Sequence, residues 1–136
     1  MIIMGIDVGK RGGLAVYDTV LGSFVYMQVF HFTSMLELYA HLKKLNDLYK
    51  FDSFVIGEAF GQRVVVKYQS KFYGVVELVS ERIEIPTVYV SDRTARAAVL
   101  GKGQGNNKAL VHETFKGVTP DVSDAMLFCK WYAESI

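Results

Sequence analysis

Short apolar segments fill the first part of the chain, and their patterns predict β-strands. IIMGIDVG is almost continuously apolar, as in a strand that is buried on both faces. FVYMQVFHF alternates between apolar and polar positions, which is typical of a strand with one face in solvent. LAVYD lies between them, and glycine-containing turns separate the three segments. We therefore expect an antiparallel meander of three strands.

Apolar spacings of three and four residues then predict two helices. Ser34 and Glu37 form a capping box for a helix that runs to about Tyr49. A second helix is expected from about Gln62 to Arg82. The first helix should pack through an apolar ridge that consists of Met35, Leu38, Leu42, Leu45 and Tyr49.

Two more strands and a helical C-terminal part complete the expected fold. SFVIGE and TVYV have the pattern of strands, and helical segments dominate from Ser91 onward. LGKGQGNNK interrupts these helices, and its glycines and asparagines favour an irregular loop with basic tips. The order of elements indicates an α/β fold whose mixed five-stranded sheet, three antiparallel strands and then parallel strands, is flanked by helices. In such sheets the carboxyl ends of the strands carry the site.

Composition limits the class of protein. With 136 residues, 51% of them hydrophobic, the chain can bury a full core, so we expect one domain spanning residues 1–136. Cys129 is the only cysteine, which excludes an intramolecular disulfide and a cysteine zinc site and favours a reducing, cytoplasmic location. The N-terminal apolar run stops at Asp7 without a basic leader, so neither a signal peptide nor a membrane span is expected.

Asp7 is the most informative residue, because it lies inside a strand that is otherwise apolar. Burying an ionised carboxylate is costly unless a cation or hydrogen bonds compensate for it. Three more acids are candidates to share such a cation: Glu58 ends the fourth strand, and Asp121 and Asp124 are three residues apart at the start of a final helix. Four hard oxygen ligands from three segments predict a site for divalent metal ions.

Each of the other three acids also has an ordinary structural interpretation. Asp121 follows Pro120 and precedes an apolar helix, so it is equally suited to cap that helix. Asp124 could complement the helix dipole. Glu58 could be an ordinary acid at the end of a strand.

The remaining charge is mildly basic. Setting the four candidate ligands aside leaves 15 basic residues against 10 acidic ones, a balance that suits a polyanionic partner. On the second helix, Arg63, Lys67 and Lys71 recur every four residues and could follow a phosphate backbone, although a solvated face explains them equally well. The same helix carries an apolar stripe that fits either a partner helix or the core: Val65, Tyr68, Phe72, Val75 and Val79.

Four motifs in sequence resemble the RuvC family of Holliday junction resolvases, within the RNase H-like nuclease superfamily. GIDVGKRGGLAVYD is similar to the first strand and turn of that family, and GEAF to the acidic end of its fourth strand. VLGKGQGNNKALV is similar to its basic loop and following helix, and DVSDAM to its terminal acidic pair. Departures such as Val8, where bacterial members have proline, fit a phage, viral or divergent member.

The resemblance implies an endonuclease that resolves four-way DNA junctions. Two Mg²⁺ ions per site, replaceable by Mn²⁺, would be held by Asp7, Glu58, Asp121 and Asp124, and the protein would be a homodimer. Paired symmetric nicks would leave 5′-phosphate ends, in the cytoplasm of a bacterium or a phage-infected host cell. Lys102 and Lys108 would be catalytic or contact phosphate. The other expected DNA contacts are Lys10, Arg11, Arg63, Lys67 and Lys71.

Three other functions stay open at this point. A RuvC-like nuclease could process RNA instead of DNA, or the chain could bind branched DNA without cleaving it. IDVGKRGG also has the character of a phosphate loop in nucleotide-binding proteins, although that fold needs two such domains and 136 residues supply one.

Overall fold

A computed structural model of the chain describes residues 1–8, 11–31, 34–58 and 63–136, with the backbone alone for 63–69. Its centre is a five-stranded sheet in the order β3-β2-β1-β4-β5. The strands are β1 (Ile2–Asp7), β2 (Gly12–Asp18), β3 (Ser23–Phe30), β4 (Ser53–Gly57) and β5 (Thr87–Val90). The first three strands are antiparallel, and β4 and β5 run parallel to β1. The predicted sheet is therefore confirmed.

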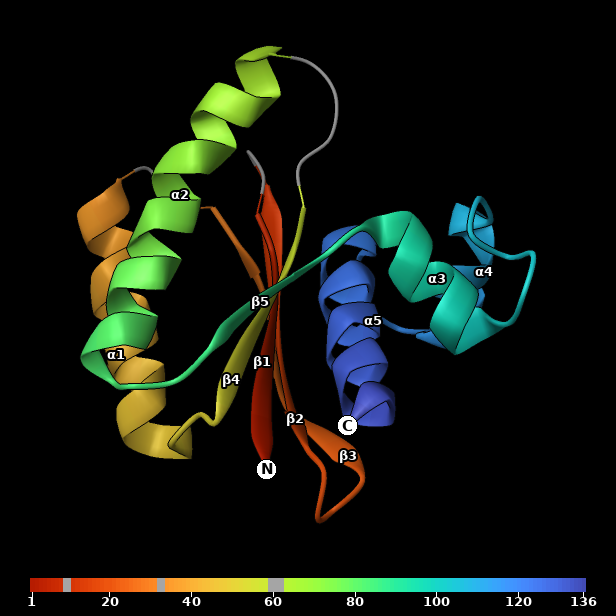
Figure 1. Cartoon of the computed structure of the whole chain (residues 1–136), viewed down its shortest axis with the longest axis horizontal. Helices are drawn as coiled ribbons and strands as arrows, with labels where there is room; N and C mark the ends of the chain where they lie inside the picture. The colour runs from red at the N-terminus through yellow and green to blue at the C-terminus, as the bar shows by residue number, and fades with distance from the viewer. Residues whose placement is uncertain (9–10, 32–33, 59–62) are drawn as a thin grey trace.

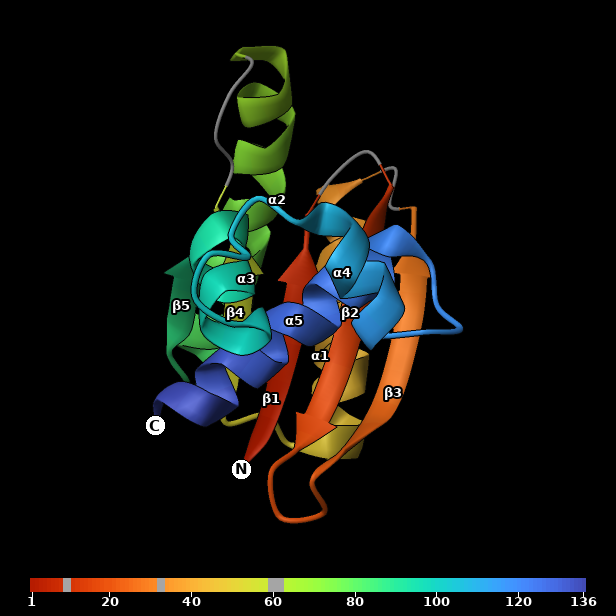
Figure 2. The same ribbon diagram turned by 90° about the vertical axis from the view of Figure 1, so that its right-hand side faces the viewer.

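Helices cover both faces of this sheet (Figure 1). α1 (Met35–Tyr49) and α2 (Arg63–Arg82) lie on one face. α3 (Asp92–Leu100), α4 (Lys108–Thr114) and α5 (Pro120–Ser135) lie on the other, with α5 crossing the middle strands (Figure 2). No helix among the described residues is long and apolar enough to span a membrane.

Alternation along β1 assigns its side chains to two separate cores. Met4 and Ile6 point toward α1 and α2 and join the larger apolar cluster there, which includes Leu38 and Leu42. Ile3 points the other way and packs with residues of α5. Because successive side chains of a strand alternate between faces, Asp7 lies on the face covered by α5.

The start of α1 confirms one prediction and corrects another. Ser34 caps the helix, since its Oγ accepts a hydrogen bond from the backbone N–H of Glu37 at 3.1 Å. Leu38, Leu42 and Leu45 form the buried ridge, but Met35 is 50% exposed, so its assignment to the ridge was wrong. Met35 is the first residue of the helix and lies three residues before Leu38, the first buried one.

The apolar stripe of α2 belongs to the core wherever its side chains are described. Phe72, Val75 and Val79 are buried in the same cluster as α1. For these three residues the core interpretation is confirmed, because they pack in one cluster with the sheet and α1. The side chains of Val65 and Tyr68 lie outside the described residues.

Candidate active site at the carboxyl ends of the strands

The end of β1 and the start of α5 both place acidic side chains at one edge of the sheet. β1 ends at Asp7, whose partner across the antiparallel pair is Gly13 of β2. A Cβ on Gly13 would lie 2.3 Å from the carbonyl oxygen of Asp121, so only glycine lets the start of α5 come this close to β2. Asp121 and Asp124, both partly buried, occupy the first turns of α5. Glycine at position 13 therefore allows the start of α5, which carries both acids, to lie beside the end of β1.

The electrostatics of Asp7 reflect the other acids at this edge of the sheet. Burial raises the pKa of Asp7 well above its ordinary value, and the charges of Asp124, Asp92 and Asp121 raise it further. Within the described residues, no hydrogen bond or ion pair to its side chain offsets this effect. Burial, with the nearby charge of Asp92, also raises the pKa of Asp124 to about 6, although Arg96 and His112 act in the opposite direction. Uncompensated negative charge is the property that a cation site needs.

Glu58 stands one residue beyond β4, on the same edge of the sheet. Its backbone N–H donates to the carbonyl oxygen of Val90 at 2.7 Å, and its side chain is exposed. The preceding residue, Gly57, accepts a hydrogen bond from the hydroxyl of Tyr73 at 2.8 Å, which ties the end of β4 to α2. The Glu58 side chain lines a pocket of about 220 Å³ together with Ser91, Asp92, Arg93, Arg96 and Lys108.

Asp92 is an acid of this site that the sequence-based prediction missed. It is the first residue of α3, after the helix cap Ser91 and directly beyond β5. Its Oδ1 would lie 3.2 Å from a Cβ built on Gly57, so it sits over the end of β4. Burial raises the pKa of Asp92, while Arg96 and Lys108 act to lower it. The available signal was its position directly after a strand that runs parallel to β1 and β4.

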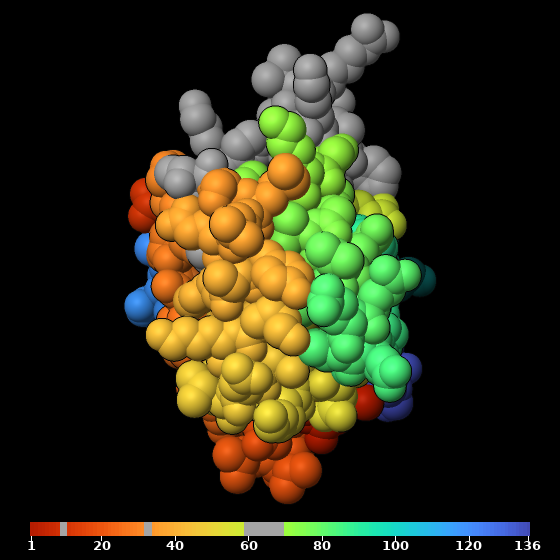
Figure 3. Space-filling view, turned by 90° about the vertical axis from the view of Figure 1, so that its left-hand side faces the viewer, coloured from red at the N-terminus to blue at the C-terminus, as the bar shows by residue number. Residues whose placement is uncertain are grey.

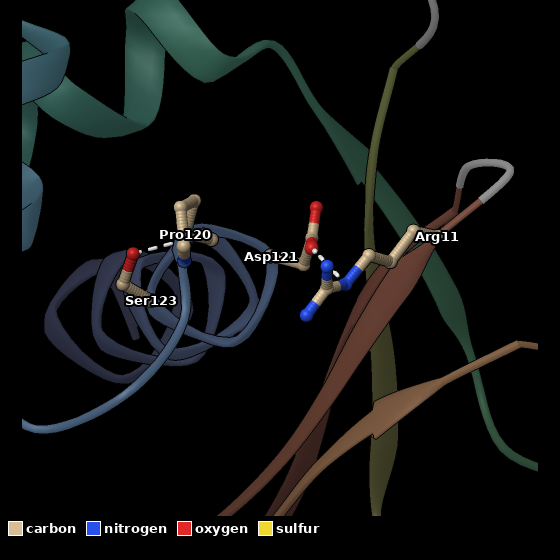
Figure 4. A network of polar contacts seen from close by, with 4 residues as sticks. All are labelled: Arg11, Pro120, Asp121 and Ser123. Carbon is tan, nitrogen blue, oxygen red and sulfur yellow. Dashed lines mark hydrogen bonds and ion pairs between the residues drawn. The ribbon is translucent and has the colours of Figure 1, made fainter.

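The basic residues predicted to contact DNA fall into three groups. Arg11 forms an ion pair with Asp121, from Nε to Oδ2 at 3.6 Å, and therefore reaches the acidic site itself (Figure 4). Lys108 lines the pocket beside Glu58, and Lys102 is exposed in the loop after α3. Lys71 is exposed on α2. Lys10 and the side chains of Arg63 and Lys67 lie outside the described residues.

Comparison with known proteins connects this architecture to junction-cleaving enzymes. No family model and no curated protein sequence matches the chain. The structure of RuvC from T. thermophilus in complex with a Holliday junction superposes with a TM-score of 0.78 at 14% identity, over 99% of this chain and 96% of that one. The fowlpox virus Holliday junction resolvase superposes with a TM-score of 0.70 at 15% identity, over 100% of both chains. For the yeast mitochondrial resolvase Ydc2 the TM-score is 0.58 at 15% identity, over 96% of this chain and 77% of that one.

This chain has the RNase H-like fold of the Holliday junction resolvases. The resolvase fold confirms the resemblance that the four sequence motifs indicated. It also confirms the predicted mixed sheet with its helical layers. Whether the chain is viral stays a prediction.

The structural alternatives for Asp121 and Asp124 can now be judged within the resolvase fold. The N-cap of α5 is Thr119, and Asp121 lies in the first turn with Arg11 as its partner, so the capping interpretation of Asp121 was wrong. A residue that mainly relieves the helix dipole would have a lowered pKa. The raised pKa of Asp124 shows that burial and neighbouring acids dominate there instead.

The residues of this resolvase fold fit a divalent metal ion by chemistry, although their side chains are not assembled as a binding site. Carboxylates are the ligands that Mg²⁺ prefers, and the charge of Asp7 lacks a counter-ion among the described residues. Within residues 1–8, 11–31, 34–58 and 70–136, however, no three acidic, histidine or cysteine side chains are arranged closely enough to hold an ion as they stand. Metal binding would therefore require the carboxylate groups to move closer together.

Proposed function

We propose that the protein is a metal-dependent, structure-selective endonuclease that resolves four-way DNA junctions by paired symmetric nicks with 5′-phosphate ends. The observation that carries this proposal is Asp7, a largely enclosed carboxylate on the edge of a resolvase fold, with the charges of Asp92, Asp121 and Asp124 gathered around it. Such a concentration of negative charge is unfavourable for folding alone and favourable for binding cations. RuvC and the fowlpox virus resolvase, which share the fold, have been solved with junction DNA.

Each group of the site has a distinct part in this function. Asp7, Glu58, Asp121 and Asp124 would hold two Mg²⁺ ions, or Mn²⁺ in their place. When bound, such ions supply an activated water and neutralise the leaving oxygen of a phosphodiester. Lys108 lies in the pocket beside Glu58, where its ammonium group can bind a phosphate of the DNA strand. Arg11 keeps Asp121 oriented from the opposite side through their ion pair.

A homodimer is part of the proposal, because two symmetric nicks require two sites related by a two-fold axis. The face formed by α1 and α2 supports it (Figure 3). A groove of about 420 Å³ between these helices is lined by Met35, Leu36, Tyr39, Val75 and Leu78. Of these, Leu36 is 75% exposed and Leu78 46% exposed. Exposed apolar residues that gather around a groove favour association with a second copy.

The dimer can be tested by sedimentation of charged variants. Leu36→Lys and Leu78→Glu should convert the dimer to a monomer, because each puts a charge into the proposed interface. Leu48→Lys is the matched control, since Leu48 is 68% exposed on α1 but does not line the groove. A wild-type protein that sediments as a monomer at all concentrations would contradict the dimer.

The decisive experiment compares substrates with one site variant and one control. Wild-type protein should nick a synthetic four-way junction at symmetric positions with Mg²⁺ and not with chelator, and should leave linear duplex intact. Asp7→Asn should lower the nicking rate by about a thousandfold or more, while junction binding persists. Asp47→Asn is the control, because Asp47 is an exposed acid on α1.

The other functions are distinguishable outcomes of the same experiment. Cleavage of structured RNA in preference to the junction would make the protein an RNA-processing nuclease. Junction binding without nicking by the wild-type protein would leave a non-catalytic binder. If Asp7→Asn nicks at the wild-type rate, Asp7 is not part of the catalytic site and the mechanism fails.

A further inference from the structure

The basic loop between α3 and α4 is docked on α3 at its centre. Gly105 is buried, whereas Gly103 and Asn106 on either side are exposed. A Cβ on Gly105 would lie 2.9 Å from Cγ of Arg93 and 3.2 Å from the Arg93 carbonyl oxygen. The loop backbone can approach the helix this closely only because Gly105 has no side chain.

Arg96 holds the loop at this point of contact. Its side chain is only 6% exposed, and its Nε–H donates to the carbonyl oxygen of Gly105 at 2.8 Å. A buried guanidinium needs negative charge nearby as well as a neutral acceptor. Asp92 supplies that charge from one turn earlier on α3, a spacing at which an acid and a base on a helix attract each other.

Hydrogen bonds within the loop connect the anchored Gly105 to Lys108. Two successive turns brace it, with Gln104 N–H donating to Gly101 O at 3.1 Å and Asn107 N–H to Gln104 O at 3.0 Å. Asn107 then caps α4, since its Oδ1 accepts from the N–H of Leu110 at 3.1 Å. Lys108 is the first residue of that helix. The position of Gly105 therefore determines where α4 starts and where Lys108 lies.

We propose that Arg96 is a positioning residue that fixes Lys108 beside the acidic site by anchoring Gly105. This role rests on the proposed function and specifies how the basic part of the site is held in place. Without the anchor, the charge of Lys108 is still present, but the loop that carries it samples more positions. The nicking step therefore slows, because it depends on placement, while junction binding changes little, because it depends mainly on total charge.

The first test needs no nuclease activity. Arg96→Lys keeps the positive charge but loses the Nε donor of the guanidinium, and Gly105→Ala breaks the same contact from the loop side. Trypsin should cleave after Lys102 about tenfold faster in both variants than in the wild type, because a buried hydrogen bond from a charged group no longer closes the loop. Cleavage after Lys50, between α1 and β4, should be unchanged and reports on the rest of the fold. Arg82→Lys is the control, an exposed arginine at the end of α2.

The second test is a double-mutant cycle on nicking. Arg96→Lys should slow single-turnover nicking by about tenfold while the junction dissociation constant stays within about threefold. Combined with Lys108→Ala, it should add no further loss, because Arg96 acts through Lys108. Effects that multiply would show that Arg96 acts on nicking by a route other than Lys108, and would overturn the proposal.

Failure of the anchor and failure of the nuclease assignment give different results. If the wild-type protein nicks no substrate, the proposed function fails, while the trypsin experiment still decides whether Arg96 holds the loop. If cleavage after Lys102 is as slow in Arg96→Lys and Gly105→Ala as in the wild type, the anchoring role is wrong whatever the nicking activity.

Discussion

The two helical layers of this protein pack on the sheet in different ways. Toward α1 and α2, the sheet presents large apolar side chains such as Ile6 and Ile56, which meet Leu38 and Leu42. Toward α5, it presents glycines as well as apolar side chains such as Ile3 and Val55: a Cβ on Gly5 would lie 2.0 Å from the carbonyl oxygen of Ala125. The first face, the α1 and α2 face, meets its helices through side chains, and the second, the α5 face, also brings a helix backbone against the strands.

The difference separates stability from function. The cluster between the sheet, α1 and α2 is apolar, so its packing contributes directly to the free energy of folding. The α5 face also encloses the carboxylates of Asp7 and Asp124, whose raised pKa values show that their charged forms are unfavourable there. Close packing of α5 therefore assembles the proposed site at some expense of stability.

The largest expected effect on stability is on the α1 and α2 face. Leu42 is fully buried in the cluster between α1 and the sheet. Leu42→Ala should lower the free energy of unfolding by about 2 to 5 kcal/mol, measured by denaturant titration, because it leaves a cavity. Nicking per folded molecule should be unchanged. Leu48→Ala, at an exposed position on the same helix, is the control and should change stability by no more than about 0.5 kcal/mol. Loss of specific activity in Leu42→Ala would break the division between the two faces.

A smaller change in stability, accompanied by lost activity, is expected on the α5 face, where glycines of the sheet meet the backbone of α5. Gly13→Ala places a methyl group against the backbone of Asp121 and should lower the free energy of unfolding by about 1 to 3 kcal/mol. Because α5 must shift, nicking should fall as well, which separates this variant from Leu42→Ala. The control is Gly74→Ala on α2, where no described atom beyond the neighbouring residues and the backbone of the helix itself lies within 4 Å of the added Cβ, so that helix propensity should make the change stabilising. Unchanged nicking in Gly13→Ala would show that the approach of α5 does not set the site.

Most of the fold was predictable from the sequence because its signals are local. The apolar run of β1, the alternation of β3 and the cap of α1 each depend on residues that are neighbours in the chain. The stripe on α2 was ambiguous for the same reason: Phe72, Val75 and Val79 have a spacing that fits a core and also fits a partner helix. Only the packing of α2 on α1 and the sheet shows that these three residues belong to the core.

The candidate site was predictable where a residue is unusual in its own segment. Asp7 stands out in an apolar strand, but Asp92 begins an ordinary helix and Arg96 is an ordinary helical arginine. Asp92 joins the site only because β5 lies next to β4, and Arg96 is buried only because the loop folds back onto α3. Such information lies in the arrangement of elements, which local patterns do not contain.

The unfavourable charge of the carboxylates on the α5 face should make the stability of the protein depend on pH. The folded-state pKa of Asp124 is raised from 3.8 to about 6, so its protonated form favours the fold. This contribution is complete below about pH 4 and is lost as the pH rises through about 6. At pH 7.5 and without metal, Asp124→Asn should therefore stabilise the protein by about 1 to 2 kcal/mol, after allowance for solvent screening. Added Mg²⁺ should stabilise the wild type more than the variant. If Asp124→Asn changes stability as little as Asp47→Asn, the ionised form of Asp124 does not destabilise the fold.

The smallest expected effect on stability concerns Tyr73, which connects the α1 and α2 face to the candidate site. Its hydroxyl on α2 donates to the carbonyl oxygen of Gly57, next to Glu58, and its ring packs edge-to-face against Tyr89 at 5.7 Å between centroids. Tyr73→Phe keeps the ring and removes the hydrogen bond, so the free energy of unfolding should fall by only about 0.5 to 1.5 kcal/mol. Tyr49→Phe, on the same face at the last residue of α1 and outside the groove, is the control. Nicking should decrease in Tyr73→Phe and not in Tyr49→Phe, because the end of β4 sets the position of Glu58. Equal nicking in the two variants would mean that α1 and α2 contribute to stability alone, and the separation between the faces would then be complete.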